Sequence, residues 1–313
     1  MRTAIRRSSA LVFLIVAGLQ VQAQQLQYLS GQSIVPFFEG WEKNPDGSFD
    51  MLFGYLNRNF REELNIPLGP ANRIEPAALQ QLQPTYFYPR RHRFMFRVRV
   101  PKDWGKKDVV WTLTAHGRTE KAIGYLLPEL MIDEQVVAQN RGGGGGPENK
   151  APSIAIEGPA DRTVSLDESV SLIVKVSDDG IPKGRETVPE LAVSDQPGVG
   201  VDVDGSGRRL VANGRFARRN VPGLRVAWLQ WRGPGKITFD PWFMEGIDDH
   251  MPGWVPPPMP ADGKVSTTAR FSAPGTYVVR AIADDGALFT PIDLTINVTP
   301  GAAAASRDES GRR

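Results

Sequence analysis

Hydrophobic and polar residues alternate with a period of two in many short segments of the chain. The clearest case is the segment 90–100, in which one face carries Phe94, Phe96, Val98 and Val100 and the other carries Met95, Arg97 and Arg99. Because successive side chains of a strand point to opposite sides, this pattern predicts a strand with one buried face. The opposite face is expected to be basic and to lie in water.

Two pairs of alternating segments are expected to form hairpins. Residues 37–42 and 49–57 flank the sequence Asn-Pro-Asp-Gly at 44–47, whose residue types are typical of a tight turn. In the second pair, His116 and Gly117 stand between two further alternating segments. Glycine adopts the positive φ that a two-residue hairpin turn requires, so this dipeptide is predicted to be the turn.

The composition of the apolar segments points to one fold class. They are rich in Val, Ile, Phe, Trp and Tyr, which suit a pleated, half-buried surface. The 32 glycines and 26 prolines are scattered between these segments, as in proteins with many short strands. No segment has the pattern of a long helix, and residues 58–84 are interpreted as an irregular surface excursion. We therefore predict an all-β protein.

A run of five glycines within the sequence "NRGGGGGPENKAP" at 140–152 divides the chain. Consecutive glycines lose too much conformational entropy on ordering to belong to a core. We therefore expect a flexible linker at 141–151 between two β-sandwich domains, which cover residues 24–140 and 152–300. Residues 301–313 are expected to form a disordered tail.

The second half of the chain carries several motifs in a characteristic order. They are Ala151-Pro152, an alternating strand at 170–176 that leads into "SDDG" at 177–180, Trp228 followed by "GPG" at 233–235, and "PGTY" at 274–277 leading to "DDG" at 284–286. With this order and spacing, the sequence resembles the PKD-type immunoglobulin-like repeats of bacterial exported proteins. The resemblance implies a module for spacing, adhesion or partner contact rather than a catalyst. It covers about half of the chain.

The alternation of apolar residues in this half agrees with a sandwich of two sheets. Val226 and Trp228 are expected to point inward from a central strand. The residues expected to oppose them are Tyr277, Val279, Ala281 and Ala283 on the next strand and Ile292, Leu294, Ile296 and Val298 on the last. The chain departs from the family pattern through two long insertions, at 189–223 and 240–263.

The N-terminus has the pattern of a secretory signal. Arg2, Arg6 and Arg7 precede an apolar segment at 10–19, and small residues follow before Gln24, so residues 1–23 are predicted to be removed. That segment is too short to span a bilayer, and no later segment is long enough. Removal takes away three arginines and no acids, which changes the formal net charge from +2 to about −1. We expect an exported protein, periplasmic or extracellular, that does not bind nucleic acid.

The chain contains no cysteine, which excludes disulfides, thiolate metal sites and a cysteine nucleophile. The sequence also has no GxSxG, HExxH or phosphate-binding loop motif. We therefore expect the protein not to be an enzyme and to need no cofactor. A carbohydrate-active or metal-assisted hydrolase is the alternative, with the candidate residues Glu245, Asp248, Asp249 and His250.

Calcium is the one cofactor for which the sequence offers candidate ligands. Asp202, Asp204 and Ser206 match the first half of a calcium loop, but Asn213 stands where a bidentate carboxylate is required. Alternating residues on both sides favour a hairpin at this place instead. The pairs Asp178-Asp179 and Asp284-Asp285 end two strands, and they are the second candidate set for a shared cation. Asp-Gly sequences are also ordinary turns, and that interpretation is favoured.

Two groups of residues are candidates for binding a ligand. Tyr88, Arg90 and Arg91 mix cations with aromatic rings, which suits an anionic polymer, although a solvated basic face is the more common outcome. The second insertion contributes Trp242, Trp254, Asp248, Asp249 and His250. Packing of its two tryptophans onto a sheet or onto the first domain is the favoured alternative to a ligand site.

These observations lead to one functional expectation with two alternatives. The protein is expected to be an exported, non-catalytic β-sandwich protein of the cell envelope that contacts a protein or a glycan. The alternatives are the hydrolase described above and a calcium-dependent adhesion module. Exposure of Trp242, Trp254 or the tyrosines at 86–88 would support binding, whereas a concave pocket with two facing carboxylates would support catalysis.

Overall fold

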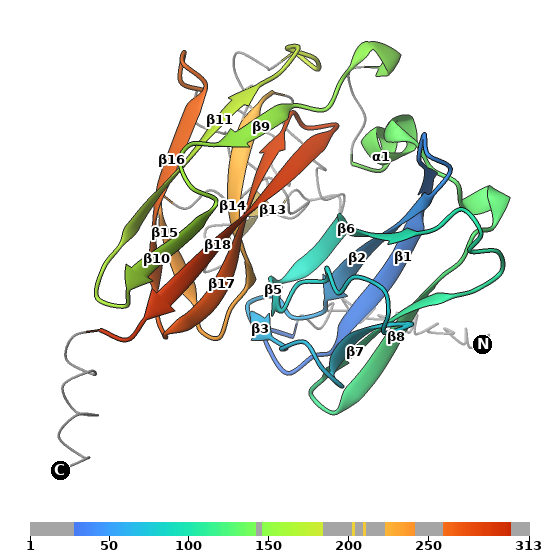
Figure 1. Ribbon diagram of the computed structural model, residues 1–313, viewed down its shortest axis with the longest axis horizontal. Helices are drawn as coiled ribbons and strands as arrows, with labels where there is room; N and C mark the ends of the chain where they lie inside the picture. Colours follow the sequence, from blue (N-terminus) through green and yellow to red (C-terminus); the bar gives the residue numbers. More distant parts are fainter. Residues whose placement is uncertain are drawn as a thin grey trace, which may run out of the picture.

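The computed structural model describes residues 28–141, 146–183, 202–203, 209–210, 223–241 and 259–301. Almost all the regular structure in these ranges is β-strand, and the longest helix among them is α1 (Glu134–Asn140). Figure 1 shows two sets of sheets lying side by side, one built from the first half of the chain and one from the second. The protein is therefore all-β, as the sequence predicts.

The first domain contains two antiparallel sheets of three strands each. One sheet has the order β1-β2-β6, with β1 (Ile34–Lys43), β2 (Phe49–Asn57) and β6 (Arg90–Val100). The other has the order β4-β7-β8, with β4 (Asn72–Glu75), β7 (Val109–Ala115) and β8 (Arg118–Gly124). A short antiparallel pair, β3 (Leu64–Asn65) and β5 (Tyr86–Phe87), forms a third, separate sheet. The sheets bury a shared core that includes Phe53, Phe96 and Trp111.

Both predicted hairpins of this domain are confirmed. β1 pairs with β2 across the turn at 44–47, and β7 pairs with β8 from Val109↔Gly124 to Ala115↔Arg118. In the second hairpin His116 has a φ of 49° and Gly117 a φ of 74°. Two consecutive residues with positive φ match the twist of the strands that they join.

Two expectations for this domain are wrong. Residues 58–84 are more than a surface excursion, because they supply β4, whose Ile74 is buried and pairs with Trp111. Phe94 does not share the face of Phe96, since a bulge opposite Gly54 interrupts the alternation and gives Phe94 a φ of 54°. Phe94 packs instead with Leu52 in a separate small cluster.

The second domain consists of two four-stranded sheets. One has the order β10-β18-β17-β14, with β10 (Asp161–Ser165), β18 (Phe289–Thr299), β17 (Gly275–Asp284) and β14 (Arg225–Arg232). The other has the order β15-β16-β11-β9, with β15 (Ile237–Asp240), β16 (Lys264–Phe271), β11 (Val170–Ser177) and β9 (Ser153–Ile156). Consecutive strands β14 and β15 belong to different sheets, and β10 runs parallel to β18. This arrangement is that of an immunoglobulin-like sandwich.

The core of this sandwich lies where the alternation predicts it. Trp228 and Tyr277 have no exposed surface and pack in one cluster with residues of both sheets. A hydroxyl-to-carbonyl hydrogen bond of 2.7 Å joins Tyr277 to Ala273, and Gly233 faces the Tyr277 ring so closely that a Cβ atom would not fit. The glycine of the "GPG" motif is thus explained by the aromatic core.

The first insertion contains a short antiparallel pair, β12 (Asp202–Val203) and β13 (Arg209–Leu210). Asp202 pairs with Leu210 and Val203 with Arg209. This register agrees with the hairpin that the sequence favours over a calcium loop. The connecting residues Asp204 and Ser206 lie outside the described residues.

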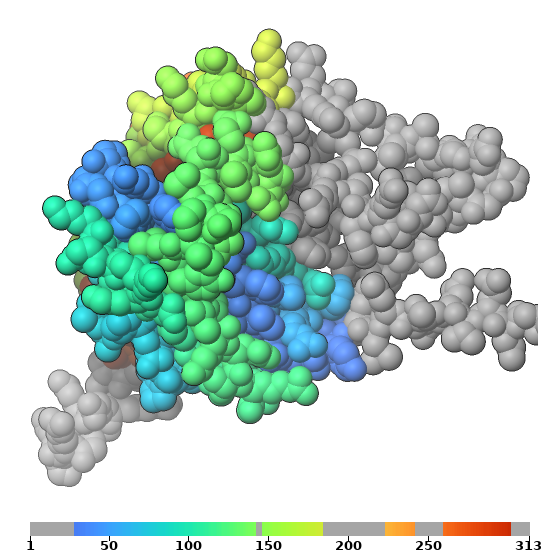
Figure 2. All heavy atoms as spheres, turned by 90° about the vertical axis from the view of Figure 1, so that its right-hand side faces the viewer, coloured from blue at the N-terminus to red at the C-terminus, as the bar shows by residue number. Residues whose placement is uncertain are grey.

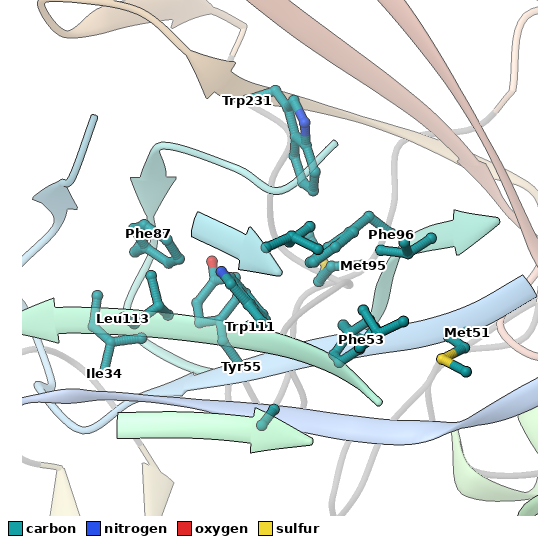
Figure 3. Close-up of a cluster of buried hydrophobic side chains, with 14 of the residues drawn as sticks. Ile34, Met51, Phe53, Tyr55, Phe87, Met95, Phe96, Trp111, Leu113 and Trp231 are labelled. Carbon is teal, nitrogen blue, oxygen red and sulfur yellow. The ribbon is translucent and has the colours of Figure 1, made fainter. Parts of the chain in front are cut away.

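One core extends across both domains. Leu229, Trp231 and Ile282 of the second domain belong to the same hydrophobic cluster as Phe96 and Trp111 of the first. Figure 3 shows Trp231 coming from a separate strand and pointing toward Met95 and Phe96, and the rings of Phe96 and Trp231 are 6.5 Å apart. Met95, which was expected to face water, is buried because the second domain covers that side of β6.

Candidate functional site

The edge strand β14 forms hydrogen bonds with both side-chain and backbone groups of the first domain. The backbone N–H of Gln230 donates to the Tyr88 hydroxyl at 2.8 Å, and the Trp231 indole donates to the Leu82 carbonyl at 3.2 Å. Arg232 donates to the Gln83 carbonyl at 3.0 Å. Burial raises the pKa of Tyr88 well above its ordinary value, so this hydroxyl remains protonated. These contacts fix both the distance and the register of β14 against the first domain.

Arg280 joins the two domains from the neighbouring strand β17. Its guanidinium lies 3.5 Å from the centre of the Trp231 ring and donates to the Met95 carbonyl at 2.8 Å. Two further bonds, of 2.7 and 2.8 Å, hold it against the Asp293 carboxylate. A planar guanidinium that stacks on a ring and binds a carboxylate in a bidentate manner has little freedom to turn. Arg280 is therefore a structural residue of the interface.

Asp284, at the end of β17, is the acceptor of a second interdomain contact. Arg141, which follows α1, binds one carboxylate oxygen at 2.5 Å, and Arg225 of β14 binds the other at 3.0 Å. All three side chains are at least nine-tenths buried. Burial acts to raise the pKa of Asp284, but the two guanidiniums outweigh it and hold the pKa below its usual value. Asp284 is thus an ionised structural residue, not a free metal ligand.

Asp285 has a different environment from that of its neighbour. Its Oδ1 accepts hydrogen bonds from the backbone N–H groups of Ala287 and Leu288 at 2.6 and 2.7 Å. Its Oδ2 is buried, and the Asn149 side chain lies against the carboxylate. Burial raises the pKa of Asp285, and the backbone donors and the Asn149 side chain only partly oppose that rise. Among the described residues, no basic side chain neutralises this carboxylate in the way that Arg141 and Arg225 neutralise Asp284.

The two predicted acidic turns lie at the same end of the sandwich. Burial is the main cause of the raised pKa of Asp178, and the charge of the Asp285 carboxylate adds to the rise. Asp179 instead accepts a hydrogen bond from the Lys150 N–H at 3.0 Å and another from the Ile181 N–H. The four acids therefore divide into two structural residues, Asp179 and Asp284, and one facing pair, Asp178 and Asp285. Among the described residues, no three His, Cys, Asp or Glu side chains gather into a metal site.

The aromatic and basic group at 86–91 does not form the expected exposed surface. Tyr86 and Tyr88 are 7% and 6% exposed, because both are covered at the domain interface. Arg91 is held by Glu39 at 2.6 Å and stacks on Phe37, and Arg90 stacks on Phe60. The structure thus places Tyr88 in the interior and gives Arg90 and Arg91 partners within the protein, whereas an open surface for an anionic polymer was one of the two alternatives for this group.

A cleft of about 290 Å³ opens where β5 and β15 approach each other. Its walls are formed by Glu63, Tyr86, Tyr88, Lys236, Ile237, Thr238 and Phe239. Glu63 accepts the Tyr86 hydroxyl at 2.6 Å and forms an ion pair with Lys236 at 2.7 Å. It is the one carboxylate among these lining residues, so they do not supply the two facing carboxylates of a glycosidase site.

Several candidate residues lie outside the part of the chain that the structure describes. They are Trp242, Glu245, Asp248, Asp249, His250 and Trp254 of the second insertion and Asp204 and Ser206 of the first. Of Asp202 only the place in β12 is described. The predicted signal segment also falls outside these ranges.

Sequence analysis missed the residues that join the domains and one residue beside the acidic pair. Arg141 and Asn149 belong to the segment that was expected to be a linker, and Arg225 and Arg280 lie on predicted strands without a recognisable motif. The signal that was available is the presence of arginine at buried positions of strands. A buried arginine needs a carboxylate or carbonyl partner, and here that partner comes from the other domain or the adjoining strand.

Comparison with known proteins assigns no family. No protein-family model and no curated protein sequence matches the chain. Among solved structures, the Yersinia pseudotuberculosis adhesin InvE has 10% identity and a TM-score of 0.23, covering 87% of this chain and 60% of the adhesin. Domains 4 and 5 of the S-layer protein SbsC have 9% identity and a TM-score of 0.23, with coverage of 86% and 93%.

The fibronectin(III)-like modules of Clostridium thermocellum CbhA have 9% identity and a TM-score of 0.22, with coverage of 84% and 91%. Scores this low carry no conclusion about fold or function. The sandwich architecture therefore rests on the sheets and registers described above. Within the described ranges, no helix is long and apolar enough to cross a membrane.

Proposed function

We propose that this chain is an exported, non-catalytic protein that contacts another protein in the cell envelope. The observation that carries the proposal is an exposed apolar strip beside β1, made of Ile123, Tyr125, Leu127 and Met131. Their exposed fractions are 48%, 36%, 48% and 57%. Large apolar side chains that are exposed in one place mark contact surfaces more often than single exposed ones do.

The strip is held in place by contacts with β1. The Tyr125 ring lies 5.9 Å from that of Phe38, and the Leu127 carbonyl accepts the Trp41 indole N–H at 2.7 Å. Met131 forms an isolated parallel bridge with Trp41. Since residues 38 and 41 are three positions apart on a strand, these anchors lie within about 10 Å of each other. Figure 2 shows this face of the molecule, with the green segment that contains the strip running down its middle.

A protein partner fits this strip better than a glycan does. Three of its four side chains are aliphatic or thioether groups, which suit the apolar centre of a protein contact. Glycan recognition relies on exposed aromatic rings, and the strip offers one, Tyr125, while Tyr86 and Tyr88 are buried. Export is inferred from the N-terminal sequence pattern, and a PKD-type second domain is inferred from the motif order. The joined domains of this chain would serve as a rigid support for the strip.

The proposal is tested by capture from envelope extracts with the mature chain as bait. The strip variant carries Ile123→Ser, Leu127→Ser and Met131→Ser, and the control carries Leu68→Ser and Leu82→Ser, which are also exposed. We expect wild type and control to retain the same protein, and the strip variant to lose it without a change in melting temperature. The retained protein is then purified and its binding to each variant is measured directly.

Two outcomes would overturn the proposal. Equal capture by the strip variant would show that the contact lies elsewhere. A specific hit on a glycan array that survives the three substitutions would favour glycan binding, and turnover of a polysaccharide substrate would establish the hydrolase alternative.

A further inference from the structure

The strand β15 is the last strand of its sheet, so one of its two long edges is open. The sheet has the order β15-β16-β11-β9, and β15 pairs with β16 from Ile237↔Phe271 to Asp240↔Thr268 and with no other described strand. An edge strand presents backbone N–H and C=O groups to which another extended chain can bind. The open edge of β15 is therefore a place to look for a binding site.

The register of β15 shows which of its backbone groups face the open edge. In an antiparallel pair, residues that bond to the neighbouring strand alternate with residues that point away from it. The Ser272 N–H donates to the Lys236 carbonyl at 3.0 Å, so the opposed positions 236 and 272 are bonded to each other. Counting along the strand, Thr238 also bonds to β16, whereas the backbone groups of Ile237 and Phe239 point to the open edge.

A side-chain hydrogen bond agrees with this assignment. The Ile237 N–H donates to the Gln230 side-chain oxygen at 2.8 Å, away from β16. The Ile237 carbonyl and both the N–H and the carbonyl of Phe239 then remain on the edge, and none of the three bonds to another described residue. An acceptor followed by a donor and a second acceptor is the pattern that the backbone of an added antiparallel strand complements.

The cleft of about 290 Å³ between β5 and β15 follows this edge. Three consecutive residues of β15, Ile237, Thr238 and Phe239, line it. The side chains of Ile237 and Phe239 are buried in the core of the sandwich, so it is their backbone that faces the cleft. The opposite wall is formed by Tyr86 and Tyr88 of the first domain. The open edge thus borders a space that a ligand can enter.

The walls of the cleft indicate what kind of chain fits it. Since the first domain stands opposite β15, a single extended chain can enter, whereas the edge of a folded sheet or a second copy of this protein is too wide. Glu63 and Lys236 neutralise each other in an ion pair of 2.7 Å, which favours an occupant without net charge. The rings of Tyr86 and Tyr88, with centres 5.2 Å apart, offer apolar surface to its side chains.

We propose that this cleft binds an extended, uncharged peptide segment of a partner protein, which adds to the sheet as an antiparallel strand beside β15. One residue of the segment would bond to both the N–H and the carbonyl of Phe239, and the residue two positions away would donate to the Ile237 carbonyl. Backbone bonds of this kind give affinity, and the side chains that meet the tyrosine wall give selectivity. The site is separate from the apolar strip, so either proposal can fail alone.

The first measurement is amide hydrogen exchange of the full mature chain, followed by NMR. In the free protein we expect the Phe239 N–H to exchange much faster than the Thr238 N–H, which is bonded to β16. The probes are synthetic peptides selected from a random phage-displayed library on the immobilised chain. A bound peptide should slow exchange at Phe239 by about tenfold or more and leave Thr238 unchanged. Slow exchange at Phe239 in the free protein would overturn the proposal, because the edge would already be paired within the chain.

A pair of matched variants tests the place of binding. Thr238→Arg extends a long side chain into the cleft from an exposed position and is expected to weaken peptide binding by about tenfold or more without lowering the melting temperature. Thr163→Arg makes the same change at an exposed position of β10, an edge strand away from the cleft, and is expected to bind like the wild type. Equal binding by both variants would overturn the proposal, as would a library that yields no binding peptide.

Modified peptides test the mode of binding. N-methylation removes one backbone donor at a time, and on an added strand only alternate donors face β15. We expect methylation to weaken binding at alternate residues of the peptide and to have little effect at the residues between them. Equal effects at all positions, or none at any, would overturn the proposed strand. The strip variant with serine at 123, 127 and 131 should bind these peptides like the wild type, which separates this test from that of the proposed function.

Discussion

The two faces of the sheet that contains β14 and β17 are both buried, but they are built differently. The inner face, with Trp228 and Tyr277, packs against apolar residues of the second domain. The outer face presents Trp231 and Ile282 to the core of the first domain, and it also carries Arg280, which binds a backbone carbonyl there. The inner face gives the second domain its stability, whereas the outer face fixes how the two domains sit together.

Polar groups make the outer face specific. An apolar contact alone tolerates small rotations, because the hydrophobic effect has no direction. Here Gln230, Trp231 and Arg232 each place a donor on a particular group of the first domain. Each of these donors would be buried without a partner if the domains slid by one residue. We therefore expect the two domains to unfold together.

The largest effect is expected from the inner face. Trp228→Ala removes a fully buried indole from the middle of the sandwich and should lower the free energy of unfolding by about 5 kcal/mol. A loss of that size exceeds the margin of many domains, so the second domain should be unfolded at 37 °C. Circular dichroism during thermal unfolding measures this. A melting curve equal to that of the wild type would place the core elsewhere.

The outer face is tested by Trp231→Ala, with a smaller expected loss of about 3 kcal/mol. Removal of this side chain opens a cavity between Phe96 and Ile282 and takes away the ring on which Arg280 stacks. Calorimetry should then show two separate unfolding transitions in place of one. Trp231→Phe keeps an aromatic ring and serves as the control. A single transition at the wild-type temperature in Trp231→Ala would mean that the two faces do not differ as described.

Alternation of apolar residues predicted the inner face but not the outer one. Val226, Trp228, Tyr277 and Val279 are buried as expected, because a period of two places them on one side. Leu229 and Met95 belong to the opposite sides of their strands, and they are buried only because another domain covers them. Alternation with a period of two indicates which residues share a face of a strand. It carries no information about a segment from a distant part of the chain that packs on that face.

The same limit applies to the acidic turns. The "DDG" sequences were predicted to end strands at one end of a sandwich, and Asp178 and Asp285 do meet there. Which aspartate of each pair faces the other depends on side-chain direction at the strand end. Asp284 forms ion pairs with two arginines, and one of them, Arg141, lies 143 positions away in the sequence. Contacts of this range follow from topology and not from local sequence.

Asp284 and Asp285 show a similar difference between two adjacent residues, because one is paired with cations and the other is not paired with any described basic side chain. The pKa of Asp284 lies below its usual value of 3.8, so its ionised form stabilises the fold above that pH, and this contribution is lost as the pH falls through the folded-state pKa. The pKa of Asp285 lies above 3.8. Its ionisation thus reduces stability at neutral pH, and this cost disappears as the pH falls below 3.8.

The most discriminating pair of effects, which includes the smallest, is expected from replacing each of the two by asparagine. Asp284→Asn leaves two buried guanidiniums without a counter-charge and should cost about 3 kcal/mol at pH 7, with the difference from wild type shrinking toward pH 3. Asp285→Asn keeps the acceptor for Ala287 and Leu288 but removes the repulsion with Asp178, so its stability should equal that of the wild type or exceed it by up to about 1 kcal/mol.

Urea unfolding at pH 7 and at pH 3 measures both differences. If Asp285→Asn were as destabilising as Asp284→Asn at pH 7, its carboxylate would have a cationic partner within the protein, and the second domain would have no unbalanced acidic pair at this end. Opposite signs for the two variants would show instead that one turn holds two carboxylates with different roles. The first closes the domain interface by its charge, and the second carries a charge that none of the described basic side chains neutralises.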